Sequence, residues 1–303
     1  MFKSFCSNRG LIAGLLSLTM LLTACDSGSL DSPTEQDAAT ATVEAMAPEQ
    51  AEATNEASAD AQLAPRRAVV VERLPYAEVD DELVYGHFVF PADMIEPLAA
   101  IVVIHEWWGL NDNIRAMAER LAGEGYIVLA VDLFGGKVAT SPEGARRLMI
   151  PVVENPESAS ENMRQAYEFV NATAGAPRIA SLGWSFGGGW SMNTAIMFPD
   201  ELDAVVIYYG HVSADEDKLR PVDVPILGLF GAEDQSISVE SVRAFEAALE
   251  RLRKNYEIQI YPGAGHAFAN PKGANYNAAA ADDAWKRTLR FLGQNLSAGA
   301  DGS

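Results

Sequence analysis

Ser185 has the surroundings expected of a nucleophile. It stands in the sequence Gly183-Trp184-Ser185-Phe186-Gly187, between a predicted strand and a predicted helix. Such a stretch is typical of a sharp strand-to-helix turn that holds a serine hydroxyl above a sheet, where small glycines let the chains approach. The alternative interpretation is a plain N-cap serine at a glycine-rich helix start. Because a serine hydroxyl is a weak nucleophile, the first interpretation requires a general base nearby.

His266 is the candidate for this base. The chain has four histidines, and only His211 and His266 follow Ser185. In sites built on this kind of turn, the chain order is nucleophile, acid, then histidine. His211 follows the next predicted strand, which leaves no room for a strand that carries an acid. His266 lies in the glycine-rich stretch 263–268, between the last predicted strand and the last predicted helix; a buried structural histidine is the alternative.

The acid is expected in the loop after the strand that ends near residue 230. Asp234 is the candidate, because it lies between Ser185 and His266 in the chain and would orient and stabilise the imidazole. Glu233 is its competitor, since a shift of one residue in the loop would exchange the two side chains. The first oxyanion donor is expected to be the Phe186 N–H at the helix start.

A second oxyanion donor is expected from the loop after an early strand, which is the stretch 104–109. His105 and Glu106 stand there beside two tryptophans. A zinc protease motif would need a second histidine four residues after His105, but Gly109 occupies that position, so we expect no metal. The chain also lacks a phosphate-binding loop motif, and no cofactor is expected.

Alternating buried strands and amphipathic helices must position these residues. This pattern predicts an α/β fold with a doubly wound, mostly parallel sheet and helices on both faces, whose sites lie at the carboxyl ends of the strands. The expected strands cover 68–74, 83–90, 98–104, 126–131, 178–183, 204–209, 225–230 and 256–261. The expected helices cover 113–123, 142–149, 156–173, 187–198, 239–254 and 277–295.

The first 66 residues differ from the rest in composition. Residues 1–24 combine a basic start with a short apolar run, which is typical of a signal peptide. Cys25 follows Leu22-Thr23-Ala24, which resembles the lipobox of bacterial lipoproteins and implies a lipid anchor on Cys25. Residues 25–66 predict an acidic, disordered linker, and 67–303 the folded domain. We therefore expect a domain tethered to the bacterial cell envelope that faces the periplasm or the extracellular side.

Net charge and cysteine content exclude several classes of function. The formal net charge is −20, which disfavours nucleic acid as a partner and adsorption to anionic lipid without an anchor. Both cysteines, Cys6 and Cys25, precede the predicted domain, so it has no thiolate for catalysis or metal binding. The sequence gives no indication of oligomeric state.

Taken together, these motifs resemble the dienelactone hydrolase family of α/β-hydrolases. The motifs that carry the resemblance, over roughly residues 70–295, are 105–109, 132–134, 183–188, 208–210, Asp234 and 263–268. The resemblance implies hydrolysis of a small ester or lactone, with Ser185 at the position of the usual cysteine nucleophile and Asp234 and His266 as acid and base. It also implies Phe186 and Trp107 as oxyanion donors and Glu106 as a contact of the nucleophile.

Two departures from the family pattern bear on the substrate. A serine replaces the cysteine, which leaves the role of Glu106 open. Lys137 and Asn270 stand where we expect substrate-binding arginines, and neither replaces a bidentate guanidinium, so we expect a substrate other than dienelactone. The remaining candidates, expected to support the site or to line the substrate pocket, are His105, Trp107, Trp108, Trp184 and Tyr209.

The sequence thus predicts an envelope-anchored serine esterase or lactonase. Two alternatives stay open: a peptidase on a related sheet, and a non-catalytic binding lipoprotein that kept the fold. Reaction of Ser185 with an active-site probe separates the enzymes from the binding protein.

Overall fold

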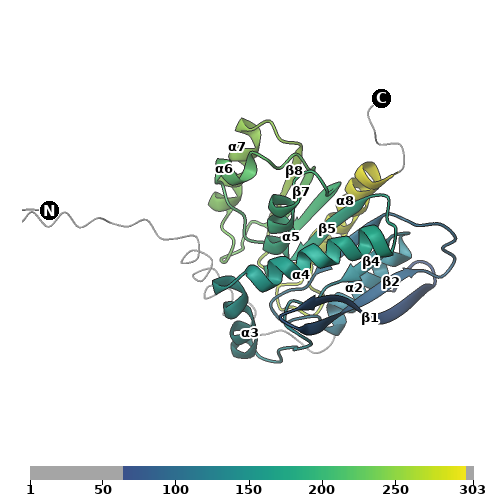
Figure 1. Cartoon of the computed structure of the whole chain (residues 1–303). Helices are drawn as coiled ribbons and strands as arrows, with labels where there is room; N and C mark the ends of the chain where they lie inside the picture. Colours follow the sequence, from purple (N-terminus) through teal and green to yellow (C-terminus); the bar gives the residue numbers. More distant parts are fainter. Residues whose placement is uncertain (1–63, 298–303) are drawn as a thin grey trace, which may run out of the picture. The chain divides into compact units, whose positions relative to one another are not determined.

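Eight strands form one sheet in the computed structural model, which describes residues 64–297 (Figure 1). Their order across the sheet is β1-β2-β4-β3-β5-β6-β7-β8. The strands are β1 (Val69–Val79), β2 (Glu82–Pro91), β3 (Ala100–Ile104), β4 (Ile127–Ala130), β5 (Ile179–Trp184), β6 (Ala204–Tyr208), β7 (Ile226–Gly231) and β8 (Tyr256–Tyr261).

The pairing of the strands divides the sheet into two parts. β1 and β2 form an antiparallel hairpin, and β2 pairs antiparallel with β4. Every pair from β4 through β8 is parallel. The predicted doubly wound, mostly parallel α/β fold is therefore confirmed. Because the parallel strands end at one edge of the sheet, the loops that follow β3, β5, β6, β7 and β8 lie along that edge.

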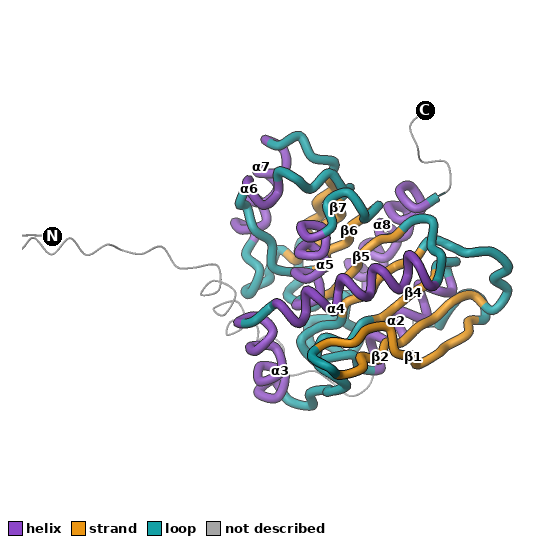
Figure 2. Tube along the Cα trace, in the orientation of Figure 1, coloured by secondary structure: helices purple, strands orange, loops and turns teal. Residues whose placement is uncertain are grey.

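Helices cover both faces of the sheet, as Figure 2 shows for α4 and α5 in front of the strands. One core contains residues of α2 and α8, and the other contains residues of α3, α4, α5 and α7. The helices are α2 (Asp112–Gly123), α3 (Pro142–Glu154), α4 (Glu157–Glu168), α5 (Phe186–Met197), α6 (Glu216–Leu219), α7 (Val239–Arg251) and α8 (Ala278–Leu296), with a π-helical turn η1 (Phe169–Thr173) after α4.

The side chains of β3 pack alternately into the two hydrophobic cores. Val102 and Ile104 pack in the core under α5, whereas Ile101 and Val103 pack in the core under α2 and α8. Successive side chains of a strand point to opposite faces, so a strand with a helical layer on each side must be apolar at every position. All five residues of β3 are buried.

The helices differ from the sequence prediction at several points: α6 was not expected, α7 ends three residues earlier than expected, and α3 and α4 differ most. We expected a helix to end at Met149, two residues before Pro151, which has no backbone N–H to donate. The helix α3 continues to Glu154, and the Asn155 N–H bonds to the Pro151 carbonyl. The single helix expected over 156–173 is interrupted, since η1 changes the hydrogen-bond spacing after Glu168.

The leader and most of the linker lie outside the described residues. This applies to the predicted signal peptide 1–24, to Cys25 and to residues 26–63. Among residues 64–297, no helix has the length and apolar character needed to cross a membrane.

Candidate active site

Ser185 occupies a strained turn between β5 and α5. Its backbone angles are φ 55° and ψ −117°, a region that residues with a side chain rarely adopt. The Ser185 N–H donates to the Tyr208 carbonyl at 2.9 Å, and the Ser185 carbonyl accepts from the Gly189 N–H at 3.1 Å. Both bonds hold the turn, so the sheet and the first turn of α5 fix the direction of the serine side chain.

The glycines around Ser185 permit close backbone contacts. A Cβ atom on Gly183 would lie 2.0 Å from the Gly187 carbonyl oxygen, and one on Gly187 would lie 2.2 Å from the Ile104 carbonyl oxygen. No real Cβ atom tolerates such contacts, so both positions require glycine. The absence of a side chain on Gly187 thus lets the start of α5 lie close to the end of β3.

Ser185, His266 and Asp234 form one hydrogen-bonded chain. Ser185 Oγ lies 2.9 Å from His266 Nε2, and His266 Nδ1 lies 2.9 Å from Asp234 Oδ2. All three residues are buried. An Asp carboxylate can only accept, so Nδ1 carries the ring proton and Nε2 is left to accept from the serine hydroxyl.

The loop after β7 distinguishes Asp234 from its competitor. Asp234 Oδ1 accepts from the backbone N–H groups of Ser236 and Ile237, at 2.8 and 2.7 Å. The Glu233 side chain is exposed, and its N–H donates to the Ala264 carbonyl. The turn therefore directs Asp234, and not Glu233, toward His266.

The backbone around His266 is fixed from the following loop. Asn275 Nδ2 donates to the His266 carbonyl at 3.1 Å, and Ala267 adopts a positive φ of 60°. The Tyr209 ring packs edge-on against the imidazole with centroids 5.4 Å apart, and Tyr209 also has a positive φ, of 37°. Tyr209 was expected near the substrate; the structure places it fully buried, as a side wall of the imidazole.

The two predicted oxyanion donors come from the start of α5 and from the loop after β3, which approach each other closely at Gly187. Phe186 is the first residue of α5, where a backbone N–H has no partner in the helix and the helix dipole favours a negative charge. Trp107 lies in the loop after β3, whose carbonyls at 104 and 105 would contact a side chain on Gly187. The Trp107 indole is fully buried and packs edge-on against Trp108, with centroids 5.1 Å apart.

Glu106 is buried between Asn270 and the imidazole. Its Oε2 accepts from Asn270 Nδ2 at 2.8 Å, whereas Oε1 has no hydrogen-bond partner among the described residues. Burial raises the pKa of Glu106 to about 7, an effect partly offset by the nearby His266 and by the Asn270 bond. The Tyr209 hydroxyl is close enough to influence this pKa but does not form a hydrogen bond of standard geometry with it.

His105, predicted to support the site or line the substrate pocket, supports the loops beside the site. The ring is fully buried, its Nε2 accepts from the Leu133 N–H at 3.1 Å, and its Nδ1 donates to the Glu106 carbonyl at 2.6 Å. Burial lowers its pKa, so the ring is neutral near pH 7. It therefore ties the loop after β3 to the loop after β4.

Trp184 is also not a pocket residue. It is the last residue of β5, and its ring packs against Tyr208, with centroids 5.5 Å apart, in the core under α2 and α8. The earlier prediction is wrong here because the side chain points to the sheet face opposite α5. Trp108 is nearly buried in the other core.

Lys137 and Asn270, the expected substitutes for arginine, lie in different surroundings. Lys137 is exposed in the loop after β4, among residues that line a hollow beside the tip of the β1–β2 hairpin. Asn270 is buried, and both ends of its side-chain amide form hydrogen bonds. Its Nδ2 donates to Glu106, and its Oδ1 accepts from Asn113 Nδ2 at 3.3 Å. Asn270 thus contacts Glu106 in the position where the sequence suggested a substrate contact.

Sequence reasoning missed a buried polar network beside the site. Tyr76 Oη donates to Asn162 Oδ1 at 2.5 Å and accepts from the Asp132 N–H at 3.1 Å. Asn162 Nδ2 donates to the Asp132 carbonyl, and the Asp132 carboxylate accepts from the Phe134 and Gly136 N–H groups. These residues come from β1, α4 and the loop after β4, so no local sequence signal joins them. Within residues 64–297, no cluster of His, Cys, Asp and Glu has the grouping of a metal site.

Known proteins resemble this chain in sequence and fold. A profile of the dienelactone hydrolase family matches residues 85–296. A protein of Saccharolobus solfataricus named "Putative carboxymethylenebutenolidase" is 33% identical over 240 residues, which cover 67% of this chain and 92% of that protein. A Klebsiella pneumoniae structure named "Putative Dienelactone Hydrolase" is 25% identical with a TM-score of 0.67, over 75% of this chain and 100% of that one. The acylaminoacyl peptidase of Pyrococcus horikoshii, at 16% identity and a TM-score of 0.62 over 78% of this chain and 44% of that one, is similar in fold alone.

Proposed function

The chain belongs to the dienelactone hydrolase family, and from that premise we propose that it hydrolyses a small ester or lactone through an acyl-serine intermediate. The observation that carries the proposal is the continuous contact from Ser185 Oγ through the His266 imidazole to Asp234, with 2.9 Å at each step. A hydroxyl, a base and an anchored carboxylate in this order supply the groups that acyl transfer needs.

Acylation begins with attack of Ser185 Oγ on the ester carbonyl carbon. The hydroxyl proton passes to His266 Nε2, and Asp234 stabilises the imidazolium that forms. The carbonyl oxygen becomes an oxyanion, which the Phe186 and Trp107 N–H groups stabilise. The C–O bond of the ester then breaks, and His266 returns its proton to the leaving oxygen. Water repeats the sequence on the acyl-serine, releases the acid and restores Ser185.

The proposed substrate needs no carboxylate of its own. The Asn270 amide is already bonded to Glu106 and Asn113, and Lys137 is exposed to solvent. Neither arrangement provides the bidentate guanidinium fork that recognises a carboxylate well. We therefore propose a neutral acyl ester or lactone, and not a dicarboxylic lactone, as the substrate class.

Covalent labelling tests the proposed nucleophile. A fluorophosphonate probe should label the full-length wild-type protein at Ser185, and mass spectrometry of the labelled peptide identifies the residue. Ser185→Ala should lose both the label and the turnover of p-nitrophenyl acetate. A protein that neither reacts with the probe nor releases p-nitrophenol would instead be a binding protein on a hydrolase fold.

The membrane anchor is a separate proposal that rests on residues outside the described range. We propose that Cys25 is lipid-modified and holds the domain at the bacterial envelope, because a small residue precedes it directly after a short apolar run. Growth with a labelled fatty acid should label the wild-type protein and leave Cys25→Ser unlabelled. Equal labelling of both would contradict the anchor.

A further inference from the structure

Glu106, Ser185 and Tyr209 follow three neighbouring strands at one level of the carboxyl edge. The last residue pair of β3 and β5 lies two residues before Glu106 and Ser185, and the last pair of β5 and β6 lies one residue before Ser185 and Tyr209. All three residues are buried, with no more than 2% of each exposed. Glu106 and Tyr209 therefore flank the proposed nucleophile from the strands on its two sides.

Tyr209 contacts the proposed base with its ring. The ring packs edge-on against the His266 imidazole, with centroids 5.4 Å apart, and against Phe268, with centroids 5.3 Å apart. The Tyr209 N–H donates to the Leu229 carbonyl at 2.8 Å. Its φ of 37° is uncommon for a bulky residue and persists only where the surroundings enforce it. The sheet and the His266 loop thus fix the ring beside the imidazole.

The hydroxyl of Tyr209 lies beside the carboxyl group of Glu106. Among the described residues, Tyr209 Oη and Glu106 Oε1 are two of the few buried polar atoms without a hydrogen bond of standard geometry. Glu106 Oε2 already accepts from Asn270 Nδ2 at 2.8 Å. Buried polar groups are nearly always bonded, and hydrogen bonds of an active site often align only in the reacting complex. The two atoms are thus a matched donor and acceptor.

The surroundings keep Tyr209 a donor and let Glu106 change its charge. Burial raises the pKa of Tyr209 well above its ordinary value, so the hydroxyl stays protonated. Burial also raises the pKa of Glu106 to about 7, which His266, Asn270 and the Tyr209 hydroxyl partly offset. The titratable groups that act on this pair are His266, Asp234 and Tyr208.

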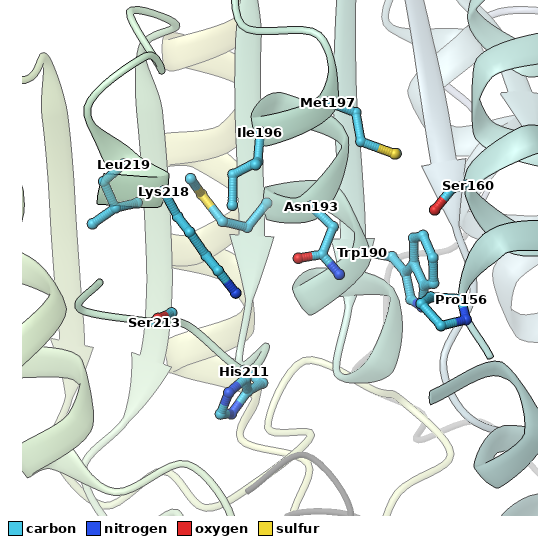
Figure 3. Close-up of a pocket in the computed structure, with 11 residues that line it drawn as sticks. Pro156, Ser160, Trp190, Asn193, Ile196, Met197, His211, Ser213, Lys218 and Leu219 are labelled. Carbon is cyan, nitrogen blue, oxygen red and sulfur yellow. The ribbon is translucent and has the colours of Figure 1, made fainter. Parts of the chain in front are cut away.

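His211 lies outside this arrangement, although it follows Tyr209 by two residues. Its ring lines a pocket of about 280 Å³ beside α5, near Ser213 (Figure 3). None of Glu106, Tyr209 and His266 lines that pocket. Burial lowers the pKa of His211, so its ring is neutral near pH 7 and adds no charge beside Tyr209. A pH effect that depends on the Tyr209 hydroxyl therefore reports on Glu106.

The charge of Glu106 matters at one step of the proposed reaction. His266 becomes an imidazolium as it takes the Ser185 proton. A carboxylate nearby stabilises this cation, and an interaction that forms only in the transition state accelerates the reaction. A protonated Glu106 provides no such charge. No proton passes between Glu106 and His266, because the carboxylate acts through its charge alone.

We propose that Tyr209 is a positioning residue of the hydrolysis: its ring holds the His266 imidazole, and its hydroxyl donates to Oε1 of the ionised Glu106 and keeps that charge beside His266. Asn270 holds the other carboxylate oxygen, so two donors fix the group. Glu106 is then a second carboxylate, besides Asp234, that stabilises the imidazolium. The inference rests on the proposed serine hydrolase function.

The pH dependence of kcat/KM tests this inference, because it reports ionisations of the free enzyme. We would measure p-nitrophenyl acetate hydrolysis by the full-length protein from pH 5 to pH 9, at the isosbestic wavelength of p-nitrophenol. Tyr209→Phe removes a donor to a charged group, so its acid limb should move to higher pH by about one pH unit. The ratio of wild type to Glu106→Gln should be near one at pH 5 and rise to about tenfold at pH 9.

Tyr208→Phe is the matched control. Tyr208 is also buried, and its hydroxyl lies 2.7 Å from Thr288 Oγ1 in the core under α2 and α8. This variant also loses a buried hydroxyl bond, but its acid limb should remain at the wild-type pH. The double variant Tyr209→Phe/Glu106→Gln should have the profile of Glu106→Gln, because the Tyr209 hydroxyl acts only through Glu106.

The outcomes separate this inference from the proposed function. An acid limb of folded Tyr209→Phe that coincides with that of wild type would overturn the inference, while wild-type turnover still supported the hydrolase. A Glu106→Gln ratio that does not change with pH would overturn it as well, and this measurement decides the question if Tyr209→Phe does not fold. Absence of turnover in the wild type would instead overturn the proposed function.

Discussion

Two buried polar networks lie at the carboxyl edge of the sheet, and they differ in where their hydrogen bonds end. The relay network contains Ser185, His266 and Asp234, joined side chain to side chain. The scaffold network consists of Tyr76, Asn162, Asp132 and His105, whose bonds end mostly on backbone groups of the loops after β3 and β4.

His105 and His266 illustrate the difference between the two networks. Both are fully buried, and in both rings the hydrogen-bond partners place the proton on Nδ1. His105 Nε2 accepts from an amide N–H, which does not give up its proton, whereas His266 Nε2 faces a serine hydroxyl, which does in acyl transfer. The two histidines therefore share burial and tautomer. They differ in the acidity of the group that donates to Nε2, which makes His105 a positioning residue and His266 the proposed general base.

Asp234→Asn should produce the largest effect, because it alters the tautomer in the relay network. An asparagine amide would donate to His266 Nδ1, which moves the ring proton to Nε2 and leaves no acceptor for the Ser185 hydroxyl. We expect kcat for p-nitrophenyl acetate to fall on the order of 10⁴-fold, with the circular dichroism spectrum unchanged. Glu233→Gln is the control, since Glu233 is exposed, and should remain near wild type. The reverse result would assign the acid to Glu233.

The relay network was largely predictable from sequence because its signals are local or follow chain order. The glycines flanking Ser185 mark the turn, and a Cβ atom on Gly183 or Gly187 would lie only 2.0 to 2.2 Å from a backbone carbonyl oxygen, so no other residue fits. His266 follows from its place after the last strand. The choice between Asp234 and Glu233 required the structure, because it depends on two backbone donors in the following turn.

The scaffold network was not predictable, because its partners are distant in sequence. The sequence places His105 beside Glu106, as in a reactive pair, but the Nε2 atom of its ring accepts a hydrogen bond from the backbone N–H of Leu133, 28 residues away. The position of Trp184 was predicted wrongly for a related reason. A strand pattern predicts that successive side chains point to opposite faces of the sheet, but it does not tell which face the last side chain of the strand points to. Glu106 lies between the two networks, since its carbonyl accepts from His105 and its carboxyl group lies near His266.

Glu106→Gln should have the next largest effect, on the pH dependence of stability. Burial raises the pKa of Glu106 to about 7, from an ordinary 4.5. Between these values the folded protein holds a proton that the unfolded chain has lost, so Glu106 makes the free energy of unfolding decrease as pH rises. The free energy of unfolding decreases by about 3 kcal/mol in total through this group, and the decrease is complete above pH ~7.

Glutamine does not ionise, so the variant should lack this loss. Urea unfolding of both proteins at pH 5 and pH 8 measures it, and the stability of Glu106→Gln relative to wild type should increase by about 2 to 3 kcal/mol between the two pH values. Other titrating groups cancel in the difference. A relative stability that does not change with pH would mean that Glu106 is ionised in the folded protein throughout, and that its charge is satisfied by more than the Asn270 bond.

Tyr76→Phe should have the smallest effect, and it tests whether the two networks are separable. Removing Oη leaves Asn162 Oδ1 and the Asp132 N–H without their partner in a buried site. We expect the free energy of unfolding to fall by about 1 to 3 kcal/mol. No proton of the proposed reaction passes through these atoms, so kcat and KM of the folded variant should stay within about threefold of wild type. A fall in kcat of two orders of magnitude at unchanged KM would show that the scaffold network sets the geometry of the relay, because the loop that holds Trp107 is tied through His105 to the loop that Tyr76 supports.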